Sequence, residues 1–331
     1  MKPRALLVIG SRTGEDRYGV ASGNRVAEAL TRRGWQITIL HAAHGSLLLH
    51  VLLEDPPDVV VPVGFGAPCE DGHIYAIARL AGIPCAGPTP AAGGLMQDKS
   101  TLSRIVDSLF SAGSGVRSPR GCALTGSLTV EDASRRVHQL RVPLVVKPAF
   151  SGSSEGLMVV QSHTEAVAVA TSLIGIEGKV LVQELENPIL AEVSVAVLDF
   201  PDGPQLLPIV ELKRDDVLVM GSEEKFGAEG RNRHIIPTVL STEITYRIGT
   251  AVMELHDAVG CVGLTRTDLL IRPDGEIVVL EMNGIPGLLE SSIACDAAQA
   301  AGISFDQLSV DYAMSAYIRR PEPRIWDGGA A

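Results

Sequence analysis

The chain has 331 residues, of which 46% are hydrophobic and 20% charged, and its net charge is −11. This length is enough for two or three packed units, and the negative charge argues against a nucleic-acid surface or an anionic membrane as a partner. A small anion such as a nucleotide remains compatible, because local cations and backbone N–H groups can bind it.

The cysteines and the apolar segments bear on the cellular compartment. The five cysteines are scattered, odd in number and contain no CxxC pair, which is typical of reduced thiols in a cytosol. The first apolar run, 4–10, stops at charged residues and indicates a strand rather than a signal peptide. No apolar segment approaches the roughly 20 residues needed to span a bilayer. We therefore expect a cytoplasmic protein with no membrane segment.

Strands and helices are expected to alternate over the first 95 residues. Strand patterns cover 4–10, 35–40, 58–65 and the short segment 83–87, and helical patterns cover 22–33 and 73–82. Such alternation predicts a mostly parallel sheet covered by helices. We expect residues 1–95 to form an N-terminal Rossmann-like α/β domain.

Two further lobes are expected after residue 95, and a flexible tail at 319–331. The central lobe, 96–183, should contain a helix near 98–113, a Pro/Gly-rich joint at 114–121, two strands within 143–160, a helix near 163–174 and a strand at 179–185. The C-terminal lobe, 184–318, should contain strands near 191–199 and 207–212, a polar loop at 221–234, a helix at 242–259 and a hairpin at 263–287.

The hairpin GLTRTDLLIRPDGEIVVLEMNGIPG carries acids inside two apolar runs. Asp274-Gly275 is a signal for a two-residue turn, which would pair Pro273 with Glu276. Asp268 would then lie opposite Glu281, and Arg266 opposite Asn283. Since side chains alternate along a strand, these last four residues should share one face. The opposite face should carry Leu269, Ile271, Val278, Leu280 and Met282.

Two carboxylates placed opposite one another destabilise a sheet unless a cation meets them. Asp268, Glu281 and Asn283 offer hard oxygen ligands that suit Mg²⁺, an ion that commonly shares its site with phosphate oxygens. The alternative is an exposed hairpin face on which Arg266 neutralises one acid. Both interpretations remain open on this stretch alone.

A second candidate site follows the strand that ends at Lys147. The loop SGSSEG (151–156) can turn backbone N–H groups and hydroxyls toward a phosphate, although it lacks the P-loop spacing. Lys99, which follows Asp98, is a second candidate cation. The alternatives are a flexible hairpin tip for the loop and a solvated charge for each lysine.

The order of these motifs resembles that of the D-alanine–D-alanine ligases, which belong to the ATP-grasp superfamily. The resemblance runs from about residue 4 to about residue 315 and rests on CEDG (69–72), QDKS (97–100), VVKPAFSGSSEG (145–156), TRTDLL (265–270) and LEMNGIPG (280–287). It implies an N-terminal parallel α/β domain and two α+β lobes that enclose ATP. It also implies an ATP-dependent carboxylate–amine ligase that joins small amino acids through an acyl phosphate.

The resemblance implies roles for individual residues in binding ATP and metal. Phosphate contacts are expected from Lys99 and Lys147, a phosphate-covering loop from Ser153 and Ser154, adenine contacts from the strand and linker with Gln183, Glu184 and Glu186, and a ribose contact from Glu192. Asp268, Glu281 and Asn283 are expected to ligate Mg²⁺, with two ions expected and Mn²⁺ as an alternative.

The resemblance also implies residues for catalysis and substrate binding. Arg266 and the backbone at Gly287 would stabilise the tetrahedral oxyanion. Lys225 would lie in a loop that closes on the γ-phosphate. Glu15 would hold the ammonium of the first amino acid, with Ser153 beside it, and Ser292 and Ile293 would bind the carboxylate of the second. Family members are commonly dimers, so a homodimer is an open expectation.

Several substrate positions depart from the family pattern HGxxGEDG and its loop tyrosine. The histidine position is Phe65, one glycine position is Cys69, and the tyrosine expected after Lys225 is Phe226. A phenylalanine at that last position resembles the branch that also makes D-alanyl-D-lactate esters. The departures are compatible with different substrates and equally with neutral drift in a cell-wall ligase.

Three hypotheses for the function therefore remain. The first is synthesis of D-Ala-D-Ala, and the second is the same chemistry on another amino or hydroxy acid in specialised metabolism. The third is a non-catalytic nucleotide-binding module. The presence of Lys99 and Lys147, together with the acid cluster of the hairpin, argues against the third hypothesis.

Overall fold

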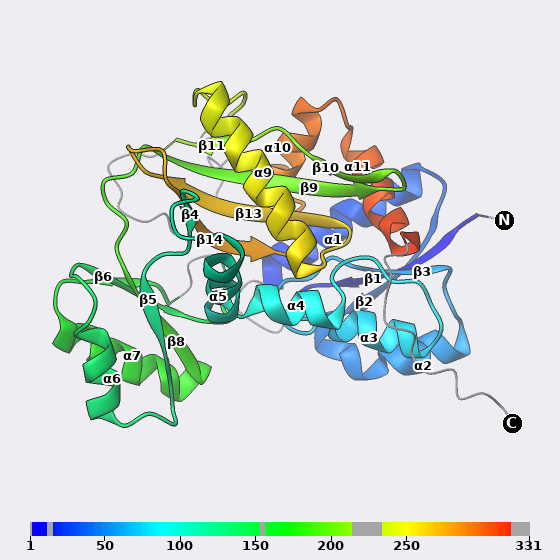
Figure 1. Cartoon of the computed structure of the whole chain (residues 1–331). Coiled ribbons are helices and arrows are strands. Elements are labelled where there is room, and N and C mark those ends of the chain that lie inside the picture. The colour runs from blue at the N-terminus through cyan, green and yellow to red at the C-terminus, as the bar shows by residue number, and fades with distance from the viewer. Residues whose placement is uncertain (1, 12–15, 153–155, 214–233, 319–331) are drawn as a thin grey trace, which may run out of the picture.

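A computed structural model of the chain describes residues 2–11, 16–152, 156–213 and 234–318 (Figure 1). These residues form a three-stranded sheet, a seven-stranded sheet and a four-stranded sheet with helices packed against them. In Figure 1 the three-stranded and four-stranded sheets lie toward opposite ends of the molecule, and the seven-stranded sheet lies between them. Within the described residues, no helix combines the length and the hydropathy that crossing a bilayer requires.

The N-terminal sheet has the order β2-β1-β3 and is parallel throughout. Its strands are β1 (Arg4–Ile9), β2 (Gln36–His41) and β3 (Val59–Pro62), and its helical segments are α1 (Asp16–Arg32), η1 (Ala42–Leu47), α2 (Leu48–Glu54) and α3 (His73–Leu80). Leu7 and Ile9 pack on the side of α1, whereas Leu6 and Val8 pack with residues of α2 and α3. The expected parallel, helix-covered sheet is confirmed. The strand expected at 83–87 is only a single bridge between Val60 and Cys85.

Helices α4 (Pro90–Gln97) and α5 (Lys99–Leu109) replace the single helix expected near 98–113. Asp98 separates them, because its carboxylate accepts hydrogen bonds from the backbone N–H groups of Ser100 and Thr101 and so caps the start of α5. The cap also fixes the position of Lys99, the first residue of α5.

The four-stranded sheet has the order β5-β8-β6-β7 and is antiparallel. Its strands are β5 (Gly121–Thr125), β6 (Leu144–Pro148), β7 (Met158–Val160) and β8 (Lys179–Glu184), with helices α6 (Val130–Val137) and α7 (His163–Glu177). Leu144, Val146, Val180 and Val182 join the core beneath those helices. The alternate residues of β6 and β8 therefore face the other way, toward the rest of the molecule.

The seven-stranded sheet runs β12-β11-β9-β13-β14-β4, with β10 paired to β9. Its strands are β4 (Val116–Arg117), β9 (Ala191–Phe200), β10 (Gly203–Leu206), β11 (Val210–Leu212), β12 (His234–Ile235), β13 (Leu264–Ile271) and β14 (Ile277–Asn283). Helices α4, α5 and α9 (Thr242–Val259) cover one face, and Figure 1 shows α9 lying across β9 and β13. β4 belongs to this sheet although its residues precede β5; the domain boundaries near residues 95 and 183 remain predictions.

The remaining helices lie between the N-terminal sheet and part of the other face of the seven-stranded sheet. They are α10 (Ile293–Ala300), α11 (Phe305–Met314) and the short η3 (Ser315–Tyr317). Leu198 of β9 and Leu264 of β13 share one core with residues of α10, α11 and α1. Beyond this cover, the same sheet face carries polar side chains.

The hairpin β13–β14 brings its acids together by a route that differs from the expected one. The two-residue turn is wrong, because Arg272 donates its N–H to the carbonyl of Glu276 and leaves a three-residue loop, 273–275. A bulge between Asp268 and Leu269 reverses this one-residue shift. Asp268 therefore lies opposite Glu281, and Arg266 opposite Asn283, as predicted.

The shift also corrects part of the expected apolar face. Leu269, Ile271 and Met282 join the core under α5 and α9, as predicted. Ile277 and Val279 join them there, where Val278 and Leu280 were expected. The longer loop shifts the pairing of the first half of β14 by one residue. Such a shift reverses the side to which each residue points, so Ile277 and Val279 face the core.

Candidate active site

A polar face of the seven-stranded sheet gathers the residues expected to bind metal. Val193, Val195 and Val197 of β9 point into the core under α9, so Glu192 and Ser194 point to the opposite side. Ser194 is the register partner of Asp268. The face opposite α9 thus carries Glu192, Ser194, Arg266, Asp268, Glu281 and Asn283.

Asp268 is held by two neighbours on this face. Arg266 donates from Nε and Nη2 to the two carboxylate oxygens, each at 2.8 Å. Ser194 donates from Oγ to Asp268 Oδ1 at 2.6 Å. The side chains of Arg266 and Asp268 are only 13% and 11% exposed, so this pair is desolvated and strongly hydrogen-bonded.

Glu281 lies next to Lys99, which comes from a distant part of the chain. Lys99 Nζ is 3.5 Å from Glu281 Oε2 and donates to the carbonyl oxygen of Ser151 at 2.7 Å. The backbone N–H of Lys99 also bonds the carbonyl of Ala149. Lys99 therefore joins the acid face of the large sheet to the start of the Gly/Ser loop. Two stretches that the sequence suggested separately meet at this lysine.

Arg266 stays charged under all ordinary conditions. Burial acts to lower the pKa of its guanidinium, but the charges of Asp268, Glu281 and Glu70 outweigh burial and raise the pKa above its usual value. A cation fixed in this way can stabilise an oxyanion without first having to gain a proton.

The residues present fit a divalent metal. Asp268 Oδ2 accepts one hydrogen bond, from Arg266, and a carboxylate oxygen has a second lone pair to offer. The side-chain amide nitrogen of Asn283 is buried with no hydrogen-bond partner among the described residues. No hydrogen bond from this nitrogen therefore fixes the direction of the amide oxygen. Two carboxylates and an amide oxygen are hard ligands of the kind that Mg²⁺ takes. The described residues contain no group of three or more His, Cys, Asp or Glu arranged for a metal.

The four-stranded sheet contributes a second face. Lys147 is the register partner of Leu181, and Val145 is the partner of Gln183. The residues between them point into the core under α6 and α7, so Lys147 and Gln183 share the side that faces away from those helices. Lys147, expected at the phosphates, and Gln183, expected at the adenine, therefore lie on the same side of this sheet.

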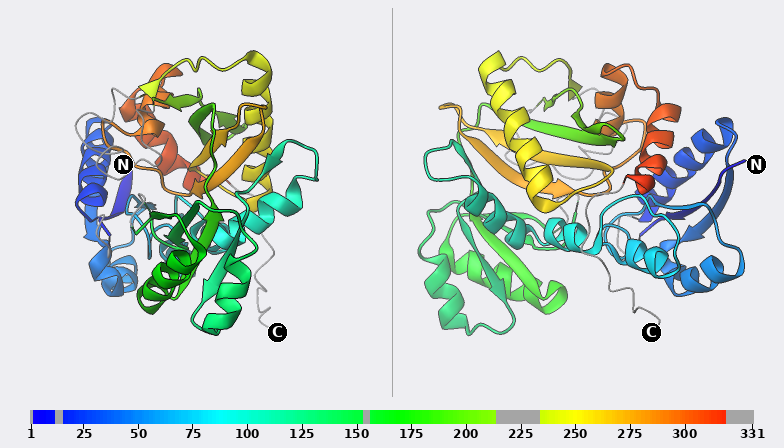
Figure 2. Two further views of the ribbon diagram at one scale, coloured as in Figure 1. Left: turned by 90° about the vertical axis from the view of Figure 1, so that its left-hand side faces the viewer. Right: turned by 45° about the vertical axis from the view of Figure 1, so that its right-hand side comes forward.

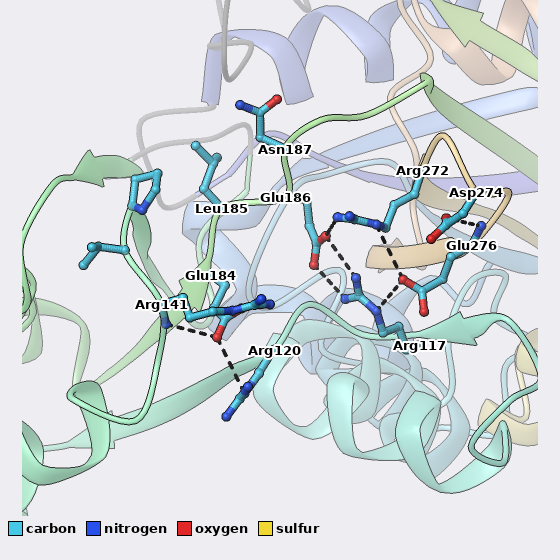
Figure 3. Close-up of a pocket in the computed structure, with 12 residues that line it drawn as sticks. Arg117, Arg120, Arg141, Glu184, Leu185, Glu186, Asn187, Arg272, Asp274 and Glu276 are labelled. Carbon is cyan, nitrogen blue, oxygen red and sulfur yellow. Dashed lines mark hydrogen bonds and ion pairs between the residues drawn. The ribbon is translucent and has the colours of Figure 1, made fainter.

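The side chains of Glu184 and Glu186 make other contacts. Glu184 accepts hydrogen bonds from Arg141, and Glu186 accepts them from Arg117 and Arg272 (Figure 3). They lie at a cavity of about 580 Å³ with Arg120, Asp274 and Glu276 in its wall. Their carboxylates are committed to arginines, so an adenine contact from this segment would come from its backbone.

The residues expected to bind the second substrate lie at the start of α10. Ser292 is the N-cap, and no side-chain hydrogen bond caps the helix. Its Oγ accepts from the N–H of Leu289, and Ile293 begins the helix. Gly287 precedes Leu288, whose N–H donates to Ser22 Oγ and whose carbonyl accepts from Arg25. Helix α1 thus positions the segment that leads into α10.

Two residues near the site had no role in the sequence interpretation. Ser194 supports Asp268 directly, and the charge of Glu70 contributes to the raised pKa of Arg266. Glu70 lies in the CEDG motif, and its carboxylate also accepts from the N–H of Gly66 at 2.5 Å. The strand register, which makes Ser194 the partner of Asp268, was the signal that could have found the serine.

The remaining expected residues are divided by what the structure describes. Phe65 is buried three residues after β3, and its N–H donates to the carbonyl of Gly10. Glu15, Ser153, Ser154, Lys225 and Phe226, with most of the loop 221–234, lie outside the described residues.

Comparison with known proteins gives one consistent result. A family model described as "D-ala D-ala ligase C-terminus" matches residues 125–312. The D-alanine–D-alanine ligases of Gloeobacter violaceus and Deinococcus radiodurans are each 30% identical to this chain, covering 92% and 93% of it and 96% of each relative.

Solved structures agree in fold. A D-alanine–D-alanine ligase from Bacillus anthracis, complexed with ATP, superposes with a TM-score of 0.76 at 21% identity, over 95% of this chain and 97% of that one. D-alanyl-alanine synthetase A from Vibrio cholerae gives a TM-score of 0.80 at 20% identity, over 96% and 99%. The chain therefore has the ATP-grasp fold and belongs to the D-alanine–D-alanine ligase family.

Proposed function

We propose that this protein is an ADP-forming ligase that joins two small amino acids through an acyl phosphate, with D-alanine as both substrates. The observation that supports the proposal is the position of Lys99, which lies between Glu281 of the hairpin and the start of the Gly/Ser loop. A phosphate held at this point would meet lysine cations on one side and a metal-ligating face on the other. Family membership supports the same activity.

The residues suit a reaction in two steps. In the first, a carboxylate oxygen of the donor attacks the γ-phosphorus of ATP and ADP leaves. Lys99 and Lys147 would offset the negative charge of the phosphates during this transfer. In the second step the acceptor amine attacks the acyl carbon, loses a proton and expels phosphate. Arg266, fixed beside Asp268, would stabilise the oxyanion that forms on that carbon.

Asp268, Glu281 and Asn283 would hold the metal, and we propose that it is a pair of Mg²⁺ ions. When bound, the metal would neutralise phosphate charge during transfer. Glu192 and the backbone near Gln183 would contact the nucleoside of ATP. Mn²⁺ is expected to substitute, because it accepts the same oxygen ligands.

The acceptor would bind at the start of α10. Backbone N–H groups at a helix N-terminus attract a carboxylate, and no side-chain hydrogen bond caps this helix. The hydroxyl of Ser292 can donate to the same carboxylate while it accepts from Leu289. This arrangement would direct the acceptor amine toward Arg266 and the metal-binding face.

A second candidate is the same chemistry on another amino or hydroxy acid. Phe65 supports it, because a buried apolar side chain stands where the family pattern has histidine. Family membership and the arrangement of Arg266, Asp268 and Glu281 disfavour a non-catalytic module. We further propose a cytoplasmic location, to which the five free cysteines are suited; a homodimer stays a prediction.

The test is ADP release in the presence of single acids and pairs of acids, with mass detection of the product. Release with D-alanine alone, accompanied by its dipeptide, is the expected result. Release only with other D- or L-amino acids or hydroxy acids would select the second candidate. Nucleotide binding without ADP release for any acid would contradict ligase activity.

A further inference from the structure

Two segments connect the four-stranded sheet to the seven-stranded sheet. Residues 118–120 join β4 to β5, and residues 185–190 join β8 to β9. The first segment is hydrogen-bonded to the end of β8, where Glu184 donates its N–H to the carbonyl of Arg120 at 2.8 Å. Figure 2 shows the four-stranded sheet with α6 and α7 projecting from the rest of the molecule on these connections. We call these two segments, with the residues that flank them, the hinge.

On the side of the seven-stranded sheet, Glu186 is held by two arginines. Arg117 donates to both of its oxygens, at 2.6 and 3.0 Å, and Arg272 donates to Oε2 at 2.8 Å. Arg117 also bonds Glu276 at 2.8 Å. Only 7% of the Glu186 side chain is exposed. Two arginines, from β4 and from the end of β13, thus fix the second connection to the large sheet.

On the side of the four-stranded sheet, Glu184 is held in a matching way. Arg141 donates its backbone N–H to Oε1 and its guanidinium to Oε2, at 2.8–3.0 Å. Arg120 lies 3.6 Å from Oε1. Burial acts to raise the pKa of Glu184, but these partners outweigh it and lower the pKa. The first connection and its flanking strand end therefore supply Arg117 and Arg120, and the second, with the end of β8, supplies Glu184 and Glu186.

A single residue separates the two anchored glutamates. In Figure 3 Glu184 and Glu186 point toward the arginines, whereas Leu185 and Asn187 point away from them. Gln183, on the proposed nucleotide side of the four-stranded sheet, is two residues from Leu185 and so points to the same side. The carboxylates thus hold the segment from one side and leave its other side for the nucleotide.

Glu184 and Glu186 both line one cavity, so the lobes are joined here mainly by ion pairs. The cavity has a volume of about 580 Å³, and arginines and carboxylates provide most of its wall. Little apolar packing joins the lobes at this point. The angle between them should depend on whether Glu186 stays paired, because leaving a buried charged partner unpaired is costly.

We propose that Glu186 is a positioning residue for nucleotide binding: it fixes the linker to the large sheet, and Leu185 is the pivot about which the four-stranded lobe turns. The carboxylate acts through Arg117 and Arg272 and does not touch ATP. This inference rests on the proposed function for the identity of the ligand, and it adds the residue that sets the orientation of the two lobes.

The test compares Glu186→Gln with wild type and with Glu131→Gln, an exposed acid on α6. Affinity for a non-hydrolysable ATP analogue is measured by titration, and amino-acid KM is measured at saturating ATP. We expect Glu186→Gln to weaken nucleotide affinity about tenfold, the scale of one lost charge-assisted hydrogen bond. Amino-acid KM and the control should stay unchanged.

Coupling and amide exchange distinguish positioning from a general loss of stability. Arg117→Gln combined with Glu186→Gln should weaken nucleotide affinity less than the product of the two single effects, because both remove one interaction. Hydrogen exchange should quicken at amides 185–190 in Glu186→Gln and stay unchanged in β1. Should Glu186→Gln fail to fold, Arg272→Lys replaces it with the same expected direction.

Two failures would be distinguishable. If wild-type protein bound no nucleotide, the proposed function would fall, while the exchange measurement would still test the hinge. If wild type bound the analogue and Glu186→Gln bound it equally well, or if both single effects multiplied, the positioning role would be wrong. Unchanged exchange at 185–190 would also overturn it.

Discussion

At the scale of single residues, the contact between Lys99 and Glu281 is the most informative feature. These residues are far apart in the sequence, and each was identified from its own motif. The structure brings Lys99 Nζ within 3.5 Å of Glu281 Oε2. Both side chains are largely shielded from water, at 12% and 18% exposed, so their charges act on each other and on a ligand with little screening.

Glu281→Gln should lower kcat by roughly 10²–10³-fold, the usual scale for a charged group lost from a transition state. The amide keeps the size of the side chain but removes the charge that would hold a cation. Steady-state ADP release measures the effect, and unfolding by urea checks that the fold survives. Glu243→Gln, at the exposed start of α9, is the matched control. Near-normal turnover in Glu281→Gln would remove this residue from the site.

Asp98 should give the protein a pH-dependent stability. Burial acts to raise the pKa of this carboxyl, but hydrogen bonds from Lys179, Ser100 and Thr101 outweigh it and lower the pKa to about 2. Because the folded pKa is below the unfolded value, the contribution is complete above about pH 4 and is lost as the pH falls toward 2. The lowering of the pKa corresponds to about 2 kcal/mol of stability for the folded protein.

Asp98→Asn should therefore reduce the free energy of unfolding by about 2 kcal/mol at pH 7. The difference from wild type should shrink as the pH falls below 4, when the wild-type carboxyl begins to gain its proton. Urea unfolding at several pH values between 7 and 3 measures it. If the difference in unfolding free energy between variant and wild type stayed constant over this range, the charge of Asp98 would not be the source of its stabilising effect.

At the scale of elements, the hairpin explains why the sequence interpretation succeeded at the acids and failed near the turn. The prediction assumed a two-residue loop and a regular ladder. The loop is longer by one residue, and a bulge beside Asp268 compensates. Alternation and turn signals alone do not reveal such a pair of irregularities. The polar face was still correct because the two errors cancel before Glu281 is reached.

Close packing of α1 on β1 shows a second limit of pattern-based prediction. A Cβ at Gly23 would lie 2.2 Å from Ile9 Cγ2 and 2.5 Å from Ile9 Cβ. In α7, by contrast, a Cβ at Gly175 meets nothing within 4 Å. Both glycines lie in helices, and only the tertiary structure shows that Gly23, unlike Gly175, allows its helix to contact a neighbouring strand.

Gly23→Ala should lower the free energy of unfolding by about 1–3 kcal/mol, since the added methyl overpacks a β-branched neighbour. Gly175→Ala should raise it by up to about 1 kcal/mol, because alanine favours the helix. Thermal and urea unfolding of both variants measures this pair. Effects of the same sign in the two variants would contradict the close approach of α1 to β1.

At the scale of the whole molecule, motif order predicted the family and the ATP-grasp fold, and strand alternation predicted the polar face of the hairpin. It did not predict the small strands β4 and β12 or the helices α10 and α11, whose patterns are short and weak. Nor did it predict the hinge, because Arg117, Arg120 and Arg272 are ordinary surface arginines until the fold brings them to Glu184 and Glu186. Long-range ion pairs of this kind leave no local signal.

The most direct test of the account is a crystal structure of the protein with a non-hydrolysable ATP analogue and Mn²⁺, read by anomalous scattering. We predict manganese density between Asp268, Glu281 and Asn283, in contact with the analogue's phosphates and with Lys99 close by. Phosphates bound elsewhere, or these three side chains turned apart with no anomalous peak between them, would contradict it.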